Sequence, residues 1–224
     1  MTSEAVFTER RAPLTRERVL QAAVELADRD GIEALSMRKL GKELGVEGMA
    51  LYRHVRGKEQ LLDGIVDAVV GEIRAPRGGT DWKADMRALA LAARTVMLRH
   101  PWAPRVLVDR QDIGPATLGH IDAVLGILSA GGFSLDLAHH ALHVLGSRIL
   151  GFTQDPFNDS ADPRPSPEEA VQQAKALAVH FPNVGELALA ATHEGALGGC
   201  DDDFEFDFSL DLILDGLDRK RQSA

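Results

Sequence analysis

The stretch Leu35-Ser-Met-Arg-Lys-Leu-Gly-Lys-Glu-Leu-Gly-Val-Glu-Gly-Met-Ala-Leu-Tyr-Arg-His-Val55 predicts two short helices joined by a tight glycine turn. Ser36 is a favourable N-cap for the first helix, and Gly45 can end that helix in the left-handed conformation. Leu51 and Val55 lie one turn apart, so they share the face of the second helix that packs on the domain. This pattern is typical of a helix-turn-helix, whose second helix enters the major groove of DNA.

The outer side of the second helix carries small, polar or basic residues, as contact with base edges and phosphates requires. These residues are Gly48, Met49, Ala50, Tyr52, Arg53 and His54. The stretch from Ser36 to Lys58 has a net charge of +4, although the whole chain has −9 and residues 1–75 sum to −1. We therefore expect a local basic surface that binds a phosphate backbone, with Lys58 reaching a phosphate. Tyr52 could instead serve mainly in packing, and Arg38 could be a simple surface charge.

Helices are also predicted on both sides of this unit. Thr15 can cap a helix that Gly31 ends, and Gly57 interrupts the helical pattern before a longer apolar helix. We expect residues 1–13 to form a flexible arm and residues 14–75 to contain a three-helix helix-turn-helix DNA-binding domain.

The stretch Arg74-Ala-Pro-Arg-Gly-Gly-Thr80 is the strongest boundary signal, because it concentrates proline and glycine. Residues 80–221 are expected to form a larger helical domain for ligand binding and dimerisation. Its helices are predicted over about 81–99, 115–130 and 134–153. Another helix is predicted to begin at Pro167, with a break at Pro182. The segments 154–167 and 196–203 are expected to be exposed and flexible.

The last segment fits two periodicities. Residues 204–211 alternate with period two, as in a half-buried strand, but apolar residues also recur every four positions. No second alternating segment exists to pair with such a strand, so we expect a helix over about 203–220. Its two apolar stripes are Phe204, Phe208 and Leu212, and Phe206, Leu210 and Leu214. A helix that is apolar on two sides would bury one stripe in its own domain and the other against a partner subunit.

Composition excludes several classes of protein. Apolar residues make up 45% of the chain and aromatic residues only 5%, which favours an all-α fold. A single cysteine excludes a disulfide scaffold and cysteine-rich zinc modules. The polar start lacks the apolar stretch of a signal peptide, and no apolar run is long enough to cross a bilayer. We expect a soluble, cytoplasmic protein.

The helix-turn-helix stretch, together with Ala50-Leu-Tyr-Arg-His-Val-Arg-Gly-Lys-Glu-Gln-Leu-Leu62, resembles the signature of the tetracycline-repressor (TetR) family. The resemblance runs from about Leu14 to Val70, and the remainder is more loosely similar to the tetracycline-repressor branch. It implies an all-helical homodimer that binds palindromic operator DNA and releases it when a small-molecule effector binds. It also implies that Arg38 and Tyr52 approach bases. The other implied DNA-binding residues are Met37, Lys39, Gly48, Met49, Ala50, Arg53, His54 and Lys58.

The sequence departs from the family pattern at several positions. Gly48 stands where a side chain could read a base, and Gly41 stands where alanine is usual, which predicts a looser first helix. Leu107 occupies the position of a histidine that helps to hold a drug-bound magnesium ion in the tetracycline-binding members, and Asp155 matches an acidic partner position. Without that histidine, we do not expect tetracycline to be the effector.

The effector pocket is predicted within residues 81–153. Its candidate lining residues are Met86, Leu89, Trp102, Leu107, His143 and Phe152, although apolar residues at helical spacing are usually plain core. The break His100-Pro-Trp-Ala-Pro104 could transmit effector occupancy to the DNA-binding end.

Two alternative functions remain open from the residues alone. His139 and His143 lie one turn apart and could share a metal ion, which would suit a helical metal-dependent enzyme or binding protein. A protein that only sequesters a ligand would show no duplex binding. Two histidines without a clear third ligand indicate a polar stripe more strongly than a metal site. We therefore expect a non-enzyme with no cofactor.

Overall fold

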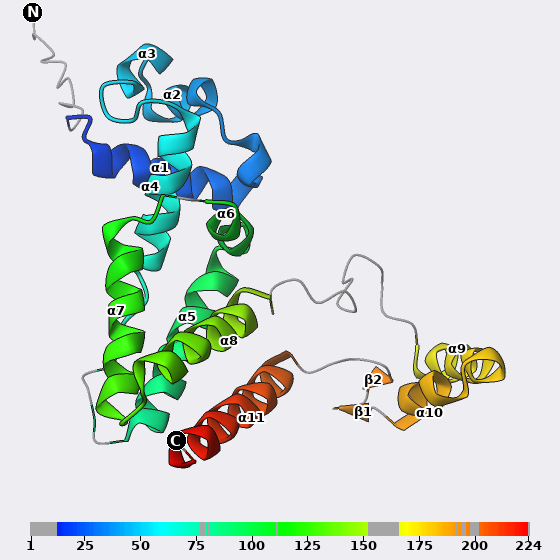
Figure 1. Cartoon of the computed structure of the whole chain (residues 1–224). Helices are drawn as coiled ribbons and strands as arrows, with labels where there is room; N and C mark the ends of the chain where they lie inside the picture. Colours follow the sequence, from blue (N-terminus) through cyan, green and yellow to red (C-terminus); the bar gives the residue numbers. More distant parts are fainter. Residues whose placement is uncertain are drawn as a thin grey trace, which may run out of the picture. The chain divides into compact units, whose positions relative to one another are not determined.

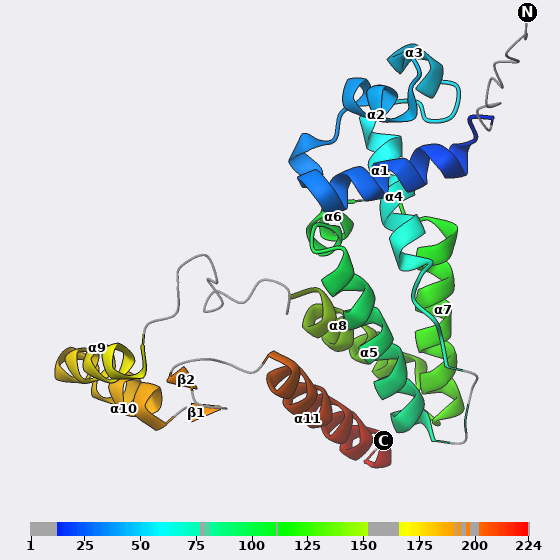
Figure 2. The same ribbon diagram turned by 180° about the vertical axis from the view of Figure 1, so that it is seen from behind.

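The computed structural model describes residues 13–76, 79, 81–110, 112–151, 166–190, 192–193, 196–197 and 202–223. These residues form helices and one short antiparallel strand pair, which confirms the predicted all-α class (Figures 1 and 2). The elements are α1 Arg16–Asp30, the 3-10 helix η1 Ile32–Ala34, α2 Met37–Leu44, α3 Gly48–Leu51, α4 Lys58–Val70, α5 Trp82–Arg99, α6 Ala103–Asp109, α7 Pro115–Ala130, α8 Leu135–Gly151, α9 Pro167–His180, α10 Pro182–Ala190, β1 Thr192–His193, β2 Ala196–Leu197 and α11 Asp202–Gln222. No helix among the described residues is long and apolar enough to span a membrane.

The chain divides into two compact units. The first contains the described residues up to 76 together with 91–124, and the second contains those from 79 to 90 and from 125 onward. Helices α5 and α7 therefore each contribute to both units. The predicted functional domains 14–75 and 80–221 do not coincide with these two units and remain a proposal. The predicted arm lies almost entirely outside the described residues.

In the first unit, α1 packs against α4 and α2 (Figure 2). Thr15 caps α1 by accepting a hydrogen bond of 3.2 Å from the Arg18 N–H, and Gly31 ends the helix with φ +82°. Both were predicted. Gly64 on α4 allows the helices to approach closely, because a Cβ there would lie 2.6 Å from Leu20 Cδ2. The fully buried core residues of this contact include Val19, Ala23, Leu26, Leu61, Ile65 and Val69.

In the second unit, α8 and α11 lie side by side. The final segment is a helix, as predicted, and its two stripes have different environments. Phe206, Leu210 and Leu214 are buried, whereas Phe204, Phe208 and Leu212 are 51–57% exposed. Arg148 of α8 joins the two helices by donating a hydrogen bond of 2.9 Å to the Glu205 carbonyl oxygen.

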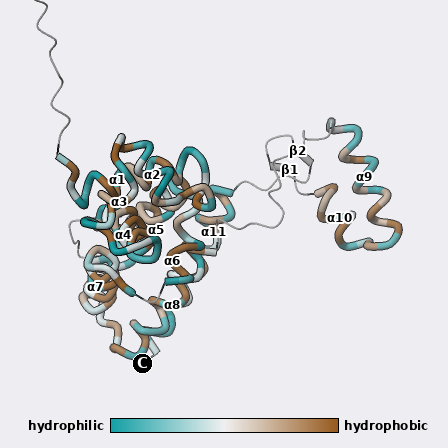
Figure 3. The backbone as a smooth tube through the Cα atoms, turned by 90° about the horizontal axis from the view of Figure 1, so that it is seen from above, coloured by the Kyte–Doolittle hydropathy of each residue, from teal (hydrophilic) through white to brown (hydrophobic). Residues whose placement is uncertain are grey.

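Helices α9 and α10 pack against each other as a hairpin. Ser166 and Glu169 form a capping box at the start of α9, and Pro182 begins α10 after the predicted break. Gly185 makes the contact close, because a Cβ there would lie 2.4 Å from Ala178 Cβ. Hydrophobic residues occur along both helices (Figure 3), and several of them are exposed.

Candidate DNA-binding surface

Helix α2 begins and ends where the sequence predicted. The Ser36 hydroxyl accepts a hydrogen bond of 3.2 Å from the Lys39 N–H. Gly45 adopts the left-handed conformation with φ +65°. Its N–H faces the carbonyl oxygens of Gly41 and Lys42, so the helix closes within one residue and the chain turns sharply into α3.

Gly41 has a packing role that the sequence did not indicate. A Cβ at this position would lie 2.9 Å from the Val46 carbonyl oxygen and 3.2 Å from the Gly48 nitrogen. The glycine therefore permits a close approach between α2 and the start of α3. The looser first helix expected from the sequence stays a prediction.

The second helix is shorter than its pattern suggested. Regular α3 covers Gly48–Leu51, and the following residues form a further turn in which the N–H groups of His54 and Val55 donate to the Leu51 carbonyl oxygen at 2.9 and 3.0 Å. Leu51 and Val55 are both fully buried, as predicted. They anchor this segment, so its opposite side is presented to solvent.

The outward residues lie where an approaching duplex could contact them. Met49 is 75% exposed and Tyr52 is 47% exposed. Arg38, Arg53 and Lys58 are also exposed, whereas Met37, Lys39, Gly48, Ala50 and His54 are half-buried. Lys39 forms an ion pair of 2.8 Å with Asp30. The ten predicted DNA-binding residues thus all have some accessible surface, and Lys39 is partly neutralised.

Cations without a carboxylate partner gather around this surface. In the part of the chain that the structure describes, these side chains have no ion pair within 4.0 Å: Arg16, Arg38, Lys42, Arg53, Arg56 and Lys58. Elsewhere many cations are paired, as Arg87 is with Asp207 and Arg99 is with Glu72. The charges of these six side chains therefore remain available to a phosphate backbone.

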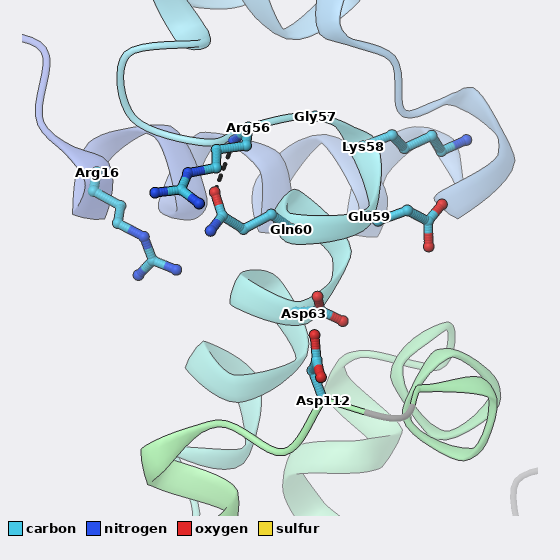
Figure 4. Close-up of a pocket in the computed structure, with 8 residues that line it drawn as sticks. All are labelled: Arg16, Arg56, Gly57, Lys58, Glu59, Gln60, Asp63 and Asp112. Atoms are coloured by element: carbon cyan, nitrogen blue, oxygen red, sulfur yellow. Dashed lines mark hydrogen bonds between the residues drawn. The ribbon is translucent and has the colours of Figure 1, made fainter.

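A cleft of about 510 Å³ lies at the start of α4 (Figure 4). Gly57 precedes the helix with φ +147°, and the Arg56 N–H donates a hydrogen bond of 2.7 Å to Gln60 Oε1. The cleft is lined by Arg16, Arg56, Gly57, Lys58, Glu59, Gln60, Asp63 and Asp112. Lys58 was predicted as a phosphate contact, and Arg56 belongs to the +4 stretch. That Arg16, 40 residues earlier in the chain, lines the same cleft as Arg56 was not predicted.

The predicted effector-binding residues have varied environments. Met86 and Leu89 are buried in α5, and Trp102 is buried at the start of α6. Leu107 is half-buried and lines a small cavity of about 30 Å³, which none of the other predicted residues lines. His143 is exposed on α8. Phe152 and Asp155 lie outside the described residues, so the effector pocket remains a prediction.

The histidines of α8 form an exposed group. The ring centroids of His139 and His143 are 4.7 Å apart, and those of His139 and His140 are 5.6 Å apart. His140 also lies 3.8 Å from Asp136. Across the described residues, no three histidine, cysteine or acidic side chains are grouped so that they could hold a metal ion.

A buried polar cluster occupies the predicted break after α5. His100 is 4% exposed, with Nδ1 2.8 Å from Asp28 Oδ1 and Nε2 3.4 Å from Glu72 Oε2. The Trp102 indole N–H donates to the same Asp28 oxygen at 2.7 Å. The cluster joins α1 and the turn after α4 to the break that precedes α6.

Together, a helix-turn-helix with an accessible basic face and a mostly helical second unit are typical of a helix-turn-helix transcriptional regulator. The chain matches the family described as "Bacterial regulatory proteins, tetR family" over residues 19–65. It matches "Tetracyclin repressor-like, C-terminal domain" over residues 75–221. The chain therefore belongs to the TetR family of transcriptional regulators, as its motifs predicted.

Individual relatives agree with this assignment. An HTH-type transcriptional regulator of Saccharopolyspora erythraea is 43% identical over 121 residues, which cover 54% of this chain and about half (51%) of that relative. The HTH-type transcriptional repressor DrrR1 of Streptomyces coeruleorubidus is 32% identical over 92% of this chain and 77% of its own length. The structure of ActR, a TetR family protein of Streptomyces coelicolor, in complex with actinorhodin gives a TM-score of 0.78 at 28% identity, over 94% of this chain and 99% of that chain.

Proposed function

We propose that this chain is a repressor that binds a two-fold symmetric DNA operator as a homodimer and is released by a small-molecule effector. The observation that carries the proposal is the two-sided character of the second helix. Leu51 and Val55 are fully buried while Met49, Tyr52 and Arg53 face solvent. A segment braced in this way can insert its outer edge into a major groove without unfolding its own domain.

Within this surface we assign different roles to different residues. Arg38 and Tyr52 read base edges, because both are exposed and carry hydrogen-bonding groups. Gly48 and Met49 lie against the groove and set how closely the backbone approaches. Met37, Lys39, Ala50, Arg53, His54 and Lys58 lie along the phosphate backbone, where they fix position without reading sequence.

Dimerisation is proposed through α8 and α11. The exposed stripe of Phe204, Phe208 and Leu212 presents apolar surface that a second copy would cover. Two copies related by a two-fold axis would present two recognition segments to successive major grooves, which accounts for a palindromic operator.

Release requires an effector that prefers the form unable to bind DNA. To move most of the population, the effector must bind that form more tightly by several kcal/mol. We propose that it binds within residues 81–153 and acts through the cluster of His100, Trp102 and Asp28, which links the break before α6 to α1. Cytoplasmic DNA would be the partner of the free protein.

The test is selection of bound sequences from a pool of random duplexes. Recovery of a palindrome is expected, and the operator it defines can then be used with variants. Tyr52→Ala and Arg38→Ala should each weaken specific binding by about 1–3 kcal/mol while the dimer persists. Absence of duplex binding at low salt would contradict the proposed function. Unchanged operator affinity in both variants would contradict the base-reading roles.

A further inference from the structure

Two arginines from separate parts of the chain enter the cleft at the start of α4. Arg16 is the first residue of α1, and Arg56 lies in the turn that follows the recognition segment. Figure 4 shows the Arg56 side chain extending toward Arg16, while Lys58 and Glu59 point to the opposite side. Arg16 lies across α4, because its Nη2 is 3.3 Å from where a Cβ at Gly64 would be.

Two carboxylates of α4 that line the cleft, Glu59 and Asp63, are bound by another arginine. Arg110 donates to Glu59 Oε2 at 2.6 Å and to Asp63 Oδ1 at 2.5 Å. The hydrogen bond with Glu59 is the main cause that raises the pKa of Arg110. Arg110 therefore already compensates two of the three carboxylates that line the cleft, and the third, Asp112, lies beside Asp63 (Figure 4). In the described structure none of the three forms an ion pair with Arg16 or Arg56.

The carboxylate of Glu17, which follows Arg16 in the chain, also has other hydrogen-bond partners. Its pKa is lowered first by a hydrogen bond from its own backbone N–H and then by one from the Thr15 hydroxyl, with smaller effects from Arg16 and His54. Glu17 thus reduces the positive potential near Arg16 but forms no ion pair with it in the described structure. Both guanidinium groups line one cleft, so an anion bound there would be attracted by both.

We propose that Arg16 and Arg56 together bind one phosphate of the operator backbone, separate from the phosphate near Lys58. The inference rests on the proposed DNA-binding function and adds a contact that recognition-helix residues do not make. A guanidinium presents paired N–H donors that match phosphate oxygens, so two of them can hold one phosphate from two sides. Arg56 directly follows Val55 in the chain, so the proposal places the cleft beside the path of a duplex seated on the recognition segment.

The experiment compares Arg16→Gln, Arg56→Gln and the double variant in the full-length protein. Binding to a long mixed-sequence duplex is measured by fluorescence anisotropy over a fourfold range of salt concentration. Each phosphate contact contributes a factor of about 3.5 to the loss of affinity over that range, or about 12 for the two contacts of a dimer. Over the fourfold salt range, the affinity of the double variant should therefore fall about 12-fold less than that of the wild type. Its salt dependence should accordingly be shallower.

Sharing of one phosphate predicts non-additive effects. Each single variant should change the salt dependence by less than half as much as the double variant does, because the remaining arginine still holds the phosphate. The double variant should lose no more affinity than Lys58→Ala does. Arg105→Gln is the matched control, because it removes the same charge from an exposed arginine that pairs with Glu33 outside the cleft. It should leave the salt dependence unchanged, and circular dichroism should show every variant folded.

The outcomes separate the two proposals. A double variant with wild-type affinity and salt dependence would overturn the arginine clamp while Lys58→Ala still weakens binding and the proposed function stands. Strictly additive losses would also overturn it, because they indicate two phosphates. Failure of the wild-type protein to bind any duplex at low salt would overturn the proposed function and the clamp together.

Discussion

The indole N–H of Trp102 donates a hydrogen bond of 2.7 Å to Asp28 Oδ1. The two residues lie 74 positions apart, one at the start of α6 and the other near the end of α1. The same carboxylate oxygen lies 2.8 Å from His100 Nδ1. One partly buried carboxylate therefore satisfies two largely buried nitrogen atoms and fixes α1 to the break before α6.

Asp28→Ala should reduce the free energy of unfolding by about 2–3 kcal/mol, because it leaves the Trp102 N–H and a His100 nitrogen without their partner in a poorly hydrated site. Urea denaturation of the wild type and the variant measures the difference. The control is Glu33→Ala, which removes an exposed carboxylate paired with exposed Arg105 and should cost less than about 0.5 kcal/mol. Equal stability of the two variants would show that the Asp28 hydrogen bonds contribute little.

Local signals in the sequence predicted much of the first unit. Thr15 and Ser36 cap helices because each places a hydroxyl before free N–H groups, and Gly45 and Gly57 end or precede helices at positive φ. Such effects involve neighbouring residues, so spacing alone reveals them. The regular part of α3 is shorter than its pattern because helical periodicity does not distinguish a full helix from a helical turn.

The contacts that sequence reasoning missed join distant positions. Nothing in the neighbourhood of Asp28 indicates Trp102, and nothing near Arg16 indicates Arg56. The role of Gly41 likewise depends on the backbone of Val46, which is brought close by the turn. Periodicity can assign a residue to a face, but only the packing of helices determines what that face meets.

Gly41→Ala should destabilise the helix-turn-helix by about 1–3 kcal/mol, because the added methyl meets the Val46 carbonyl oxygen at 2.9 Å and the backbone must shift. It should also weaken operator binding by moving the start of α3. Thermal denaturation and anisotropy titration measure the two effects.

Gly48→Ala is the matched control, because its Cβ would meet nothing closer than the Met37 carbonyl oxygen at 3.7 Å. It should leave stability within about 0.5 kcal/mol of the wild type. If both alanine variants unfold like the wild type, the close approach at Gly41 is not limiting for stability.

His120 should make stability dependent on pH. Burial lowers the pKa of this histidine in the folded protein. The unfolded state therefore binds more protons as pH falls through the unfolded histidine pKa of about 6.5, and the folded state loses stability there. Stability is retained above that pH.

His120→Asn should remove this contribution, because asparagine does not titrate. The free energies of unfolding of wild type and variant are measured in urea at pH values from about 5.5 to about 7.5. The wild type should lose stability relative to the variant toward the acidic end. Parallel pH curves would show that protonation of His120 has no part in folding.

Phe208→Asp should weaken the proposed dimer. Phe208 is 54% exposed at the middle of the outer stripe of α11, opposite the buried stripe that secures the helix to α8. Two-fold symmetry places the substitution twice in each interface, so an unfavourable charge should raise the dimer dissociation constant by about 100-fold or more. Sedimentation velocity over a dilution series measures that constant.

Val108→Asp is the control, because Val108 is a similarly exposed apolar residue on α6. If Phe208→Asp sediments as the wild type does while its circular dichroism is unchanged, the outer stripe of α11 does not form the dimer contact, and the paired arrangement of recognition segments must arise from another surface.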